Sequence, residues 1–275
     1  MNPHAAQPAS LWAMLNSLWG HRELITQMTR REVIGRYKGS SMGLLWSFLN
    51  PVFMLVVYSF VFSVVFKARW SGGDESHTQF AVVLFAGMVV HALFAEVLNR
   101  APSIIMSNAN YVKKVVFPLE ILAVVSLGSA LFHALVSLLV LLVAFFLLNG
   151  FLHWTTIFVP LVLLPLMILS LGFGWILSSL GVFVRDIEQV IGVLMTILLF
   201  LSPVFFPISA VPEPLQVWLH LNPLTFFIEQ TRGVLIWGHL PDWQGLAFHF
   251  IGASGFAWLG FFWFQKTRKG FADVL

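Results

Sequence analysis

Few residues in this chain of 275 residues combine chemical reactivity with a position inside an apolar stretch. His91, His133 and Glu96 are the main ones. A proton-driven carrier needs several ionisable groups at mid-membrane depth, where charge is costly and is kept for function. The sequence therefore disfavours proton-coupled transport. It predicts that both histidines are hydrogen-bonded packing residues, and that Glu96 either faces the helix bundle or reaches the lipid headgroups.

The motifs of soluble and membrane-embedded enzymes are missing from the sequence. The chain has no GxxxxGK[ST] phosphate-binding loop and no HExxH zinc motif. It also has no Cys, which excludes thiolate metal sites and cysteine nucleophiles. We find no convergent acids and bases of the kind that an active site requires. We therefore expect no catalytic, cofactor-binding or metal-ligating residues in this chain.

Two groups of aromatic residues offer a different chemistry. One group recurs every seven residues, which places it on one side of a helix, and the other crowds the end of a later apolar stretch. Phenylalanine on lipid-facing helix surfaces is ordinary. Alternatively, sugar rings stack their C–H faces on aromatic rings, so an aromatic lining would let glycans pass without tight binding. The lining would then comprise Trp46, Phe53, Phe60, Phe200, Phe205 and Phe206.

Two basic segments lie outside the apolar stretches. Residues 10–35 have apolar residues at roughly helical spacing and predict an amphipathic helix in the membrane interface. Residues 99–117 are longer than a simple turn needs. Both segments are either a lipid anchor and a topogenic loop, or docking elements for a cytoplasmic partner. The docking residues would be Arg30, Arg31, Arg100, Lys113 and Lys114.

A third segment follows Pro207 and is punctuated by prolines. Leu215–Leu221 and Leu224–Trp237 are apolar but too short to cross a bilayer. Each is predicted to be an interfacial or re-entrant helix, with a proline at or near its start. The pair would form a lid, or would be two passive surface helices.

The composition shows which elements must position these residues. Hydrophobic residues make up 59% of the chain and charged residues only 10%, against roughly 25% charged in a soluble domain. So few charges cannot cover a soluble surface of this size, whereas lipid removes that need. The net charge of only +3, with basic residues at the edges of apolar runs, does not indicate nucleic-acid binding. The sequence predicts a multi-pass, all-α membrane protein.

Six stretches have the length and apolar composition of a membrane span. They are residues 44–66, 80–98, 121–148, 157–184, 190–207 and 246–264, and the fifth is the weakest because Pro203 and Pro207 cut into its end. Of the 15 Lys and Arg residues, only Lys67, Arg69 and Arg232 lie in the loops of one side. The other twelve predict that both termini are cytoplasmic. The domains are a cytoplasmic segment (1–43), one six-span domain (44–264) and a basic tail (265–275).

Three stretches resemble a known family. RYKGSSMGLLWSFLNPVFMLVVYSFVFSVVF (36–66) resembles the start of type-2 ABC exporter permeases, in the branch that moves cell-surface polysaccharides. VRDIEQVIGVLMTILLFLSPVFFP (184–207) and LNPLTFFIEQTRGVLIWG (221–238) are similar to the second and third signature stretches of that family. With the number of spans, the resemblance covers nearly the whole chain.

The resemblance implies a homodimer in the bacterial cytoplasmic (inner) membrane, each subunit carrying a separate cytoplasmic ATPase subunit that binds ATP and Mg²⁺. It implies that residues 10–35 and 99–117 dock on that ATPase and that 211–238 forms outer gate helices. Arg185, Asp186 and Glu188 occupy the acidic turn of the family between spans four and five. The implied cargo is a polysaccharide linked to undecaprenyl diphosphate.

Three other functions are known for multi-pass membrane proteins. The first is a type-2 permease for a small molecule or lipid. The match at 36–66 and the aromatic spans favour a polysaccharide instead. The second is a membrane-embedded glycan enzyme, which lacks the required site. The third is the proton-coupled carrier already disfavoured. We therefore expect a non-enzymatic permease subunit of an ATP-driven exporter of O-antigen-type polysaccharide.

Overall fold

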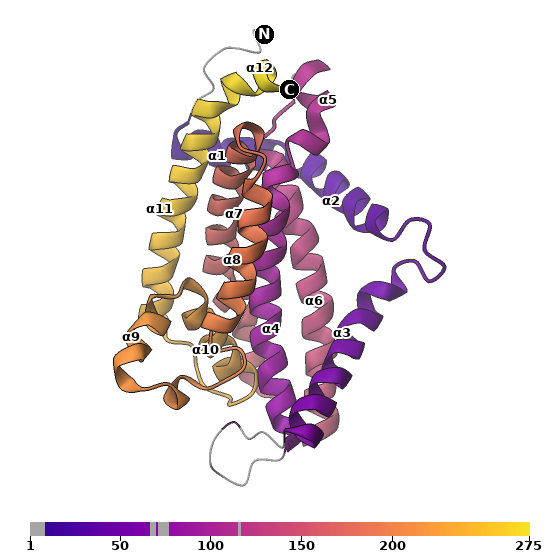
Figure 1. Ribbon diagram of the computed structural model, residues 1–275, viewed down its shortest axis with the longest axis vertical. Helices are drawn as coiled ribbons and strands as arrows, with labels where there is room; N and C mark the ends of the chain where they lie inside the picture. The colour runs from indigo at the N-terminus through magenta and orange to yellow at the C-terminus, as the bar shows by residue number, and fades with distance from the viewer. Residues whose placement is uncertain (1–8, 67–69, 71–76, 115–116) are drawn as a thin grey trace.

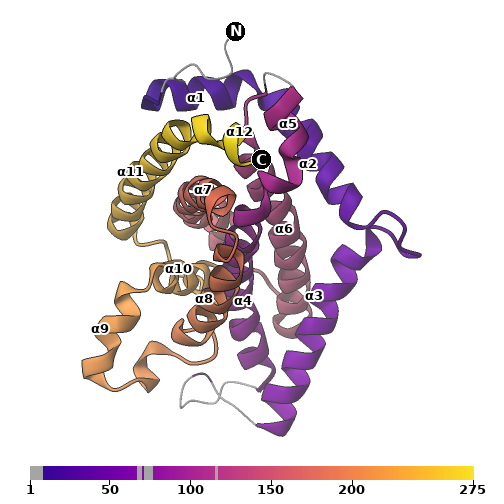
Figure 2. The same cartoon turned by 45° about the horizontal axis from the view of Figure 1, so that its top comes forward.

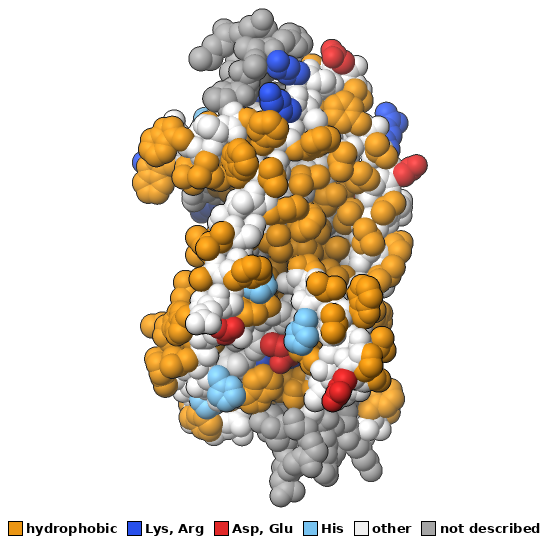
Figure 3. Space-filling model, turned by 90° about the vertical axis from the view of Figure 1, so that its left-hand side faces the viewer, with side chains coloured by type: hydrophobic (Ala, Val, Ile, Leu, Met, Phe, Trp, Pro, Cys, Tyr) orange, Lys and Arg blue, Asp and Glu red, His pale blue; other side chains and the backbone are white. Residues whose placement is uncertain are grey.

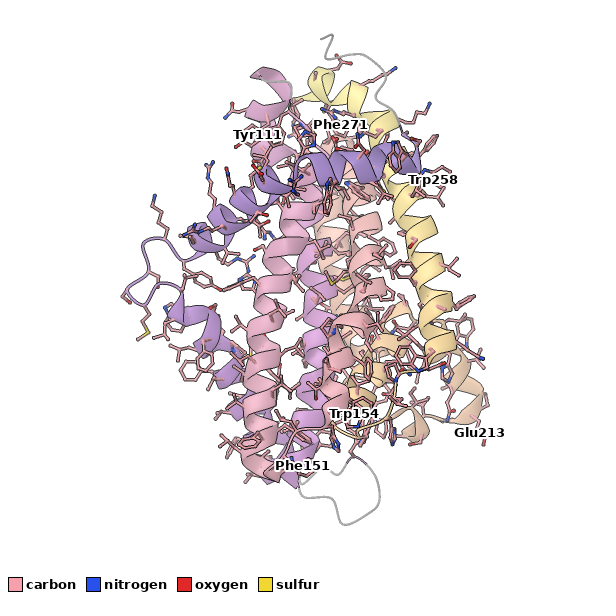
Figure 4. The ribbon with its side chains drawn as sticks, turned by 180° about the vertical axis from the view of Figure 1, so that it is seen from behind. Tyr111, Phe151, Trp154, Glu213, Trp258 and Phe271 are labelled. Atoms are coloured by element: carbon pink, nitrogen blue, oxygen red, sulfur yellow. The ribbon has the colours of Figure 1, made fainter. Side chains whose placement is uncertain are left out.

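The computed structural model describes residues 9–66, 70, 77–114 and 117–275. Within these residues the secondary structure is entirely helical. Long helices run side by side along the longest axis of the molecule (Figure 1). We call the end with α1, α5 and α12 the terminal end, and the opposite end the far end. Tyr111, Trp258 and Phe271 lie toward the terminal end, and Phe151, Trp154 and Glu213 lie toward the far end (Figure 4).

Five helical segments are long and apolar enough to cross a membrane. Each corresponds to a predicted span and differs from it by a few residues. The first helix continues past Tyr58 as a π-helix, and the fourth begins with a 3₁₀ turn. The segments are α3 (Leu45–Tyr58) with η1 (Ser59–Val65), α4 (His77–Arg100), α6 (Ile121–Asn149), η4 (Trp154–Phe158) with α7 (Val159–Phe183), and α11 (Trp243–Thr267).

The remaining predicted span, residues 190–207, is the one that departs most from its expected bounds. The helix α8 begins earlier, at Ile187, and ends at Leu201, so it has only 15 residues. Pro203 and Pro207 therefore lie beyond the helix and not in its last turn, because proline removes a donor that a continuing helix would need. By length, α8 is a short apolar helix and not one of the five candidate spans.

The N-terminal segment forms two helices instead of the single helix expected over 10–35. α1 (Leu11–Gly20) begins at Ser10, whose hydroxyl accepts a hydrogen bond from the backbone N–H of Ala13. The chain turns at His21, whose φ of −103° and ψ of 15° are not helical, and α2 (Arg22–Arg36) follows. The two helices pass over the terminal end of the bundle (Figure 2).

Short elements connect the long helices at both ends. Within the segment 99–117, the described residues 101–114 form two 3₁₀ turns, η2 (Ala101–Ser103) and η3 (Met106–Asn108), and then α5 (Ala109–Lys114), so this segment is more than a turn. At the far end, η5 (Ile208–Ala210), α9 (Glu213–Leu221) and α10 (Pro223–Leu235) confirm the two short helices after Pro207. η6 (Arg268–Gly270) and α12 (Phe271–Val274) end the chain at the terminal end.

Close packing of α7 against α11 depends on small residues. A Cβ added to Gly172 would lie 2.7 Å from the ring of Phe256 and 2.9 Å from the backbone of Ala257. Real Cβ atoms do not approach that closely, so glycine is required here for the two backbones to approach each other. Small residues serve the same purpose between helices in membranes, where van der Waals contact replaces the hydrophobic effect.

Candidate functional site

A cluster of charged residues joins α2, α4 and α6 near the terminal end, and Glu96 is at its centre. Its carboxylate lies 2.7 Å from the Arg36 guanidinium and 3.0 Å from Nδ1 of His133. Arg100, one turn further along α4, pairs with Glu32 of α2. Glu96 therefore faces other helices, which was one of the two expected positions, although its partners on α2 and α6 could not be predicted from the sequence.

Tyr37 completes this cluster. Its hydroxyl lies 3.1 Å from Nε2 of His133, and burial raises the pKa of that hydroxyl above its usual value. The second histidine within an apolar helix, His91, places Nε2 3.1 Å from the carbonyl oxygen of Met195 and so links α4 to α8. Both histidines are thus hydrogen-bonded between helices, as predicted.

A second cluster surrounds Glu120, a buried carboxylate at the start of α6. One carboxylate oxygen accepts from the Ser17 hydroxyl of α1 at 2.7 Å, and the other from the Arg268 guanidinium at 2.9 Å. The Trp175 indole N–H of α7 donates to the Glu120 carbonyl oxygen at 2.9 Å. This cluster ties α1 and the C-terminal segment to the bundle. Sequence analysis did not identify it, because its members are far apart in the chain.

The five predicted docking residues differ in how far they are free to contact a partner. Arg30 and Arg31 of α2 are exposed and have no ion pair within the described part of the chain. Arg100 instead holds Glu32, so the structure uses it within the chain. Lys113 and Lys114 end α5, and their side chains lie outside the described residues.

The predicted aromatic lining divides into two sets. Phe53, Phe60 and Phe200 are more than half exposed on the single chain. Trp46, Phe205 and Phe206 are only partly exposed. Stacking connects the segment after α8 to α8 itself and to η1, because the Phe205 ring lies 5.5 Å from that of Phe200 and 6.2 Å from that of Phe62. Phe62, which the period of seven does not include, therefore connects η1 to the segment after α8.

The turn between α7 and α8 exposes Arg185, Asp186 and Glu188 to solvent. Within the described residues, no ion pair or side-chain hydrogen bond joins them to one another or to other parts of the chain. Their role as a network at this turn stays a prediction, and any partner they have is outside this chain's own contacts.

Arg232 of α10 is fully buried near the far end. It donates to the carbonyl oxygens of Val83 (3.0 Å), Pro203 (2.6 Å) and Val204 (2.9 Å), and to Glu229 (2.9 Å). Burial lowers its pKa to about 10, which still leaves it protonated at neutral pH. It thus joins α4, α10 and the segment after α8. The positive-inside count recorded only its charge and could not show this role.

These features define a class of membrane protein. The chain is an all-helical membrane protein with charged clusters at one end, and its described residues contain no group of three or more His, Asp or Glu residues that could hold a metal. Apolar side chains cover the middle of one face, and acidic and histidine side chains surround a hollow toward its far end (Figure 3).

Comparison with known proteins identifies the family. Residues 23–236 match the ABC-2 type transporter family, and the chain belongs to it. It is 26% identical to the O-antigen export system permease protein RfbA of Myxococcus xanthus, over 95% of this chain and 99% of that protein. It is 24% identical to an RfbA of Klebsiella pneumoniae, over 92% and 95%. It is 27% identical to the polysialic acid transport protein KpsM of Escherichia coli, over 77% and 81%.

Proposed function

We propose that the chain is the permease subunit of an ATP-driven exporter that moves a lipid-linked cell-surface polysaccharide of O-antigen type across the bacterial inner membrane. The observation that carries the proposal is the match to O-antigen export permeases over nearly the full length of both proteins. The missing phosphate-binding loop supports a separate ATPase subunit that binds ATP and Mg²⁺. The cargo would be carried on undecaprenyl diphosphate.

In this proposal the chain has six spans and cytoplasmic termini. α8 would be the fifth span, although its 15 residues extend only about 22 Å at 1.5 Å per residue, against a hydrocarbon thickness of about 30 Å. The turn residues after Leu201, which accept hydrogen bonds from Arg232, would complete the crossing. The excess of Lys and Arg on the side of the termini supports the orientation.

The second copy would contact the exposed apolar faces of α3 and α8. These helices flank α4 (Figure 2), and α3 with its continuation η1 carries Phe53 and Phe60 outward, as α8 carries Phe200. A dimer that brings two such faces together would enclose an aromatic path between the copies. Exposed apolar area of this kind on a membrane helix needs either lipid or protein to cover it.

The ATPase would dock at the terminal end. α1 would lie in the interface with Trp12 and Trp19, which are 77% and 73% exposed, toward the lipid. Arg30 and Arg31 remain free for a partner, and the Glu96 cluster links α2 to the long helices α4 and α6. A push on α2 by the ATPase would thus reach the bundle through these partly exposed ion pairs.

Deleting the gene for this chain tests the proposal. Lipid-linked polymer should accumulate in the cytoplasm and surface polymer should disappear, with both restored by the wild-type chain. Normal surface polymer in the deletion strain would contradict the proposal. If the cells instead lost export of a lipid or small molecule while polymer export continued, the alternative of a type-2 permease for such a cargo would be correct.

A further inference from the structure

A cavity of about 660 Å³ opens near the far end, beside Arg232. Its walls come from α10, from the residues before α11, from η5 and from Trp70. The volume falls within the roughly 300–1,000 Å³ of pockets that bind small organic ligands. The docking segments, the turn at 184–188 and the outward faces of α3 and α8 do not contribute to it, whereas α10, one of the two helices expected to form the outer gate, does.

Three planar polar side chains in this pocket are each fixed by one oxygen. Oε1 of Glu229 accepts from Arg232 at 2.9 Å. Oε1 of Gln230 accepts from the backbone N–H of Asp242 at 2.8 Å. Oδ1 of Asp242 accepts from the backbone N–H groups of Gln244 and Gly245 at 3.1 Å, which begins α11.

In each of these side chains the second polar atom has no hydrogen bond within the described part of the chain: Oε2 of Glu229, Nε2 of Gln230 and Oδ2 of Asp242. The pocket therefore offers two acceptors and one donor group on side chains whose orientation is already fixed. Such preorganisation reduces the entropy cost of binding a ligand that carries hydroxyl groups.

Aromatic residues supply the apolar part of the pocket. Trp237 is half-buried and lines it directly. Trp70 also lines it, although this indole is largely covered because the Arg232 guanidinium lies 4.2 Å from its ring centroid. The partly exposed indole of Trp237 beside fixed acceptors and donors matches the alternation of C–H faces and hydroxyl groups around a sugar ring.

The charge of the pocket selects among sugars. Arg232 compensates Glu229, but its guanidinium is fully buried and its other donors are used by backbone carbonyl oxygens. Asp242 is exposed, and within the described residues it has no ion pair. Within the described residues, the lining thus presents the uncompensated negative charge of Asp242, which repels an anionic ligand at short range.

We propose that this pocket is a binding site for a short stretch of neutral, hydroxyl-bearing sugar rings of the exported polymer, and that it disfavours acidic sugars. The inference rests on the proposed function and goes further, because it assigns the site and the charge class of the glycan. The pocket would retain the exported polysaccharide at the far end of the protein and oppose its return.

Saturation-transfer NMR tests this site on the full-length chain with its ATPase partner in lipid nanodiscs. The probes are oligosaccharides released by mild acid from the surface polysaccharide of the source cells and separated by anion exchange into neutral and acidic fractions. The neutral fraction should receive saturation from the wild-type protein, and the acidic fraction should not. Equal transfer to both, or none to the neutral fraction, would overturn the proposal.

Two variants and a matched control locate the site. Trp237→Ala should weaken binding of the neutral fraction about five- to ten-fold, the usual effect of losing one ring contact. Trp218→Ala changes another tryptophan near the far end, 70% exposed and outside the pocket, and should leave binding unchanged. Asp242→Asn keeps a side chain that can begin α11 and removes the charge, so the acidic fraction should now bind. Unchanged neutral binding in folded Trp237→Ala protein would refute the assignment.

Export assays separate this inference from the proposed function. If the deletion strain keeps its surface polymer, the proposed function fails. If the deletion strain loses the polymer, and a folded Trp237→Ala chain restores export to the wild-type rate and binds the neutral fraction as the wild type does, then only the pocket assignment fails.

Discussion

The helices α3 and α4 are similarly apolar but have different surroundings. Both are long and apolar enough to span a membrane, yet 83% of the apolar part of α4 is buried against only 6% of that of α3. α4 contacts α6, α7, α8 and α10, whereas α3 contacts its own continuation η1 and one side of α4 and α6. Apolar composition therefore identifies a membrane helix, but it does not show whether protein or lipid surrounds the helix.

α4 is more buried than α3 because polar groups fix it to several other elements. Arg232 reaches its backbone at Val83, His91 connects it to α8, and Glu96 connects it to α2 and α6. No described ion pair involves a residue of α3. Substitutions in the two helices and in their contacts test this contrast.

Arg232→Met should have the largest effect on stability. The change removes a buried cation, leaves the carbonyl oxygens of Pro203 and Val204 without their side-chain donor, and breaks the link to the carbonyl oxygen of Val83. Breaking a buried charged network typically costs about 3–5 kcal/mol. The midpoint of thermal unfolding in detergent should therefore be markedly lower than that of the wild type, and the purified yield of the variant should be low. A midpoint equal to that of the wild type would show that Arg232 does not hold α4.

Gly87→Leu tests the same contact from the side of α4. A Cβ at Gly87 would lie 2.8 Å from Nη2 of Arg232 and 3.4 Å from the backbone of Val204. Overpacking of this kind costs about 1–3 kcal/mol. The matched control is Gly192→Leu on α8, where no atom lies within 4 Å of an added Cβ. If both variants melt alike, the tight fit around α4 is wrong.

Glu96→Gln should loosen α2 from the bundle and leave the rest folded. The residue loses its charge toward Arg36 and His133, whose side chains are 37% and 16% exposed, so solvent screening keeps the expected loss to about 1 kcal/mol. Trypsin should cleave after Arg36 or Lys38 faster in the variant than in the wild type. Arg31→Gln, at an exposed arginine of the same helix, serves as the control and should leave the cleavage rate at Arg36 and Lys38 unchanged.

The sequence predicted the helical class and the approximate bounds of most elements, because a long apolar run has few other solutions in lipid. It did not predict the break at His21, where no proline marks the turn. It placed Glu96, Arg36 and His133 in three separate segments and could not pair them, since such contacts depend on how the helices pack. Arg232 was counted as a loop charge because its burial arises from tertiary structure alone.

The smallest effect on stability is expected on α3. Phe53→Ala and Phe60→Ala remove side chains that are 53% and 59% exposed, and each should change the free energy of unfolding by less than about 0.5 kcal/mol. Phe94→Ala on α4, where the ring is 2% exposed and packs edge-on against Phe173, should cost about 3–5 kcal/mol. Thermal unfolding of the three variants in detergent compares the two helices directly.

Stability and transport should separate at these positions. If the outward face of α3 lines a path or contacts a second copy, Phe53→Ala with Phe60→Ala should reduce polymer export while the protein remains folded. Phe53→Cys and Phe60→Cys should then react with a water-soluble maleimide. If the face contacts only lipid, only lipid-soluble reagents should label these two positions. Labelling only from lipid, together with normal export, would show that α3 is exposed simply because lipid covers it, and the aromatic period of seven would then carry no function.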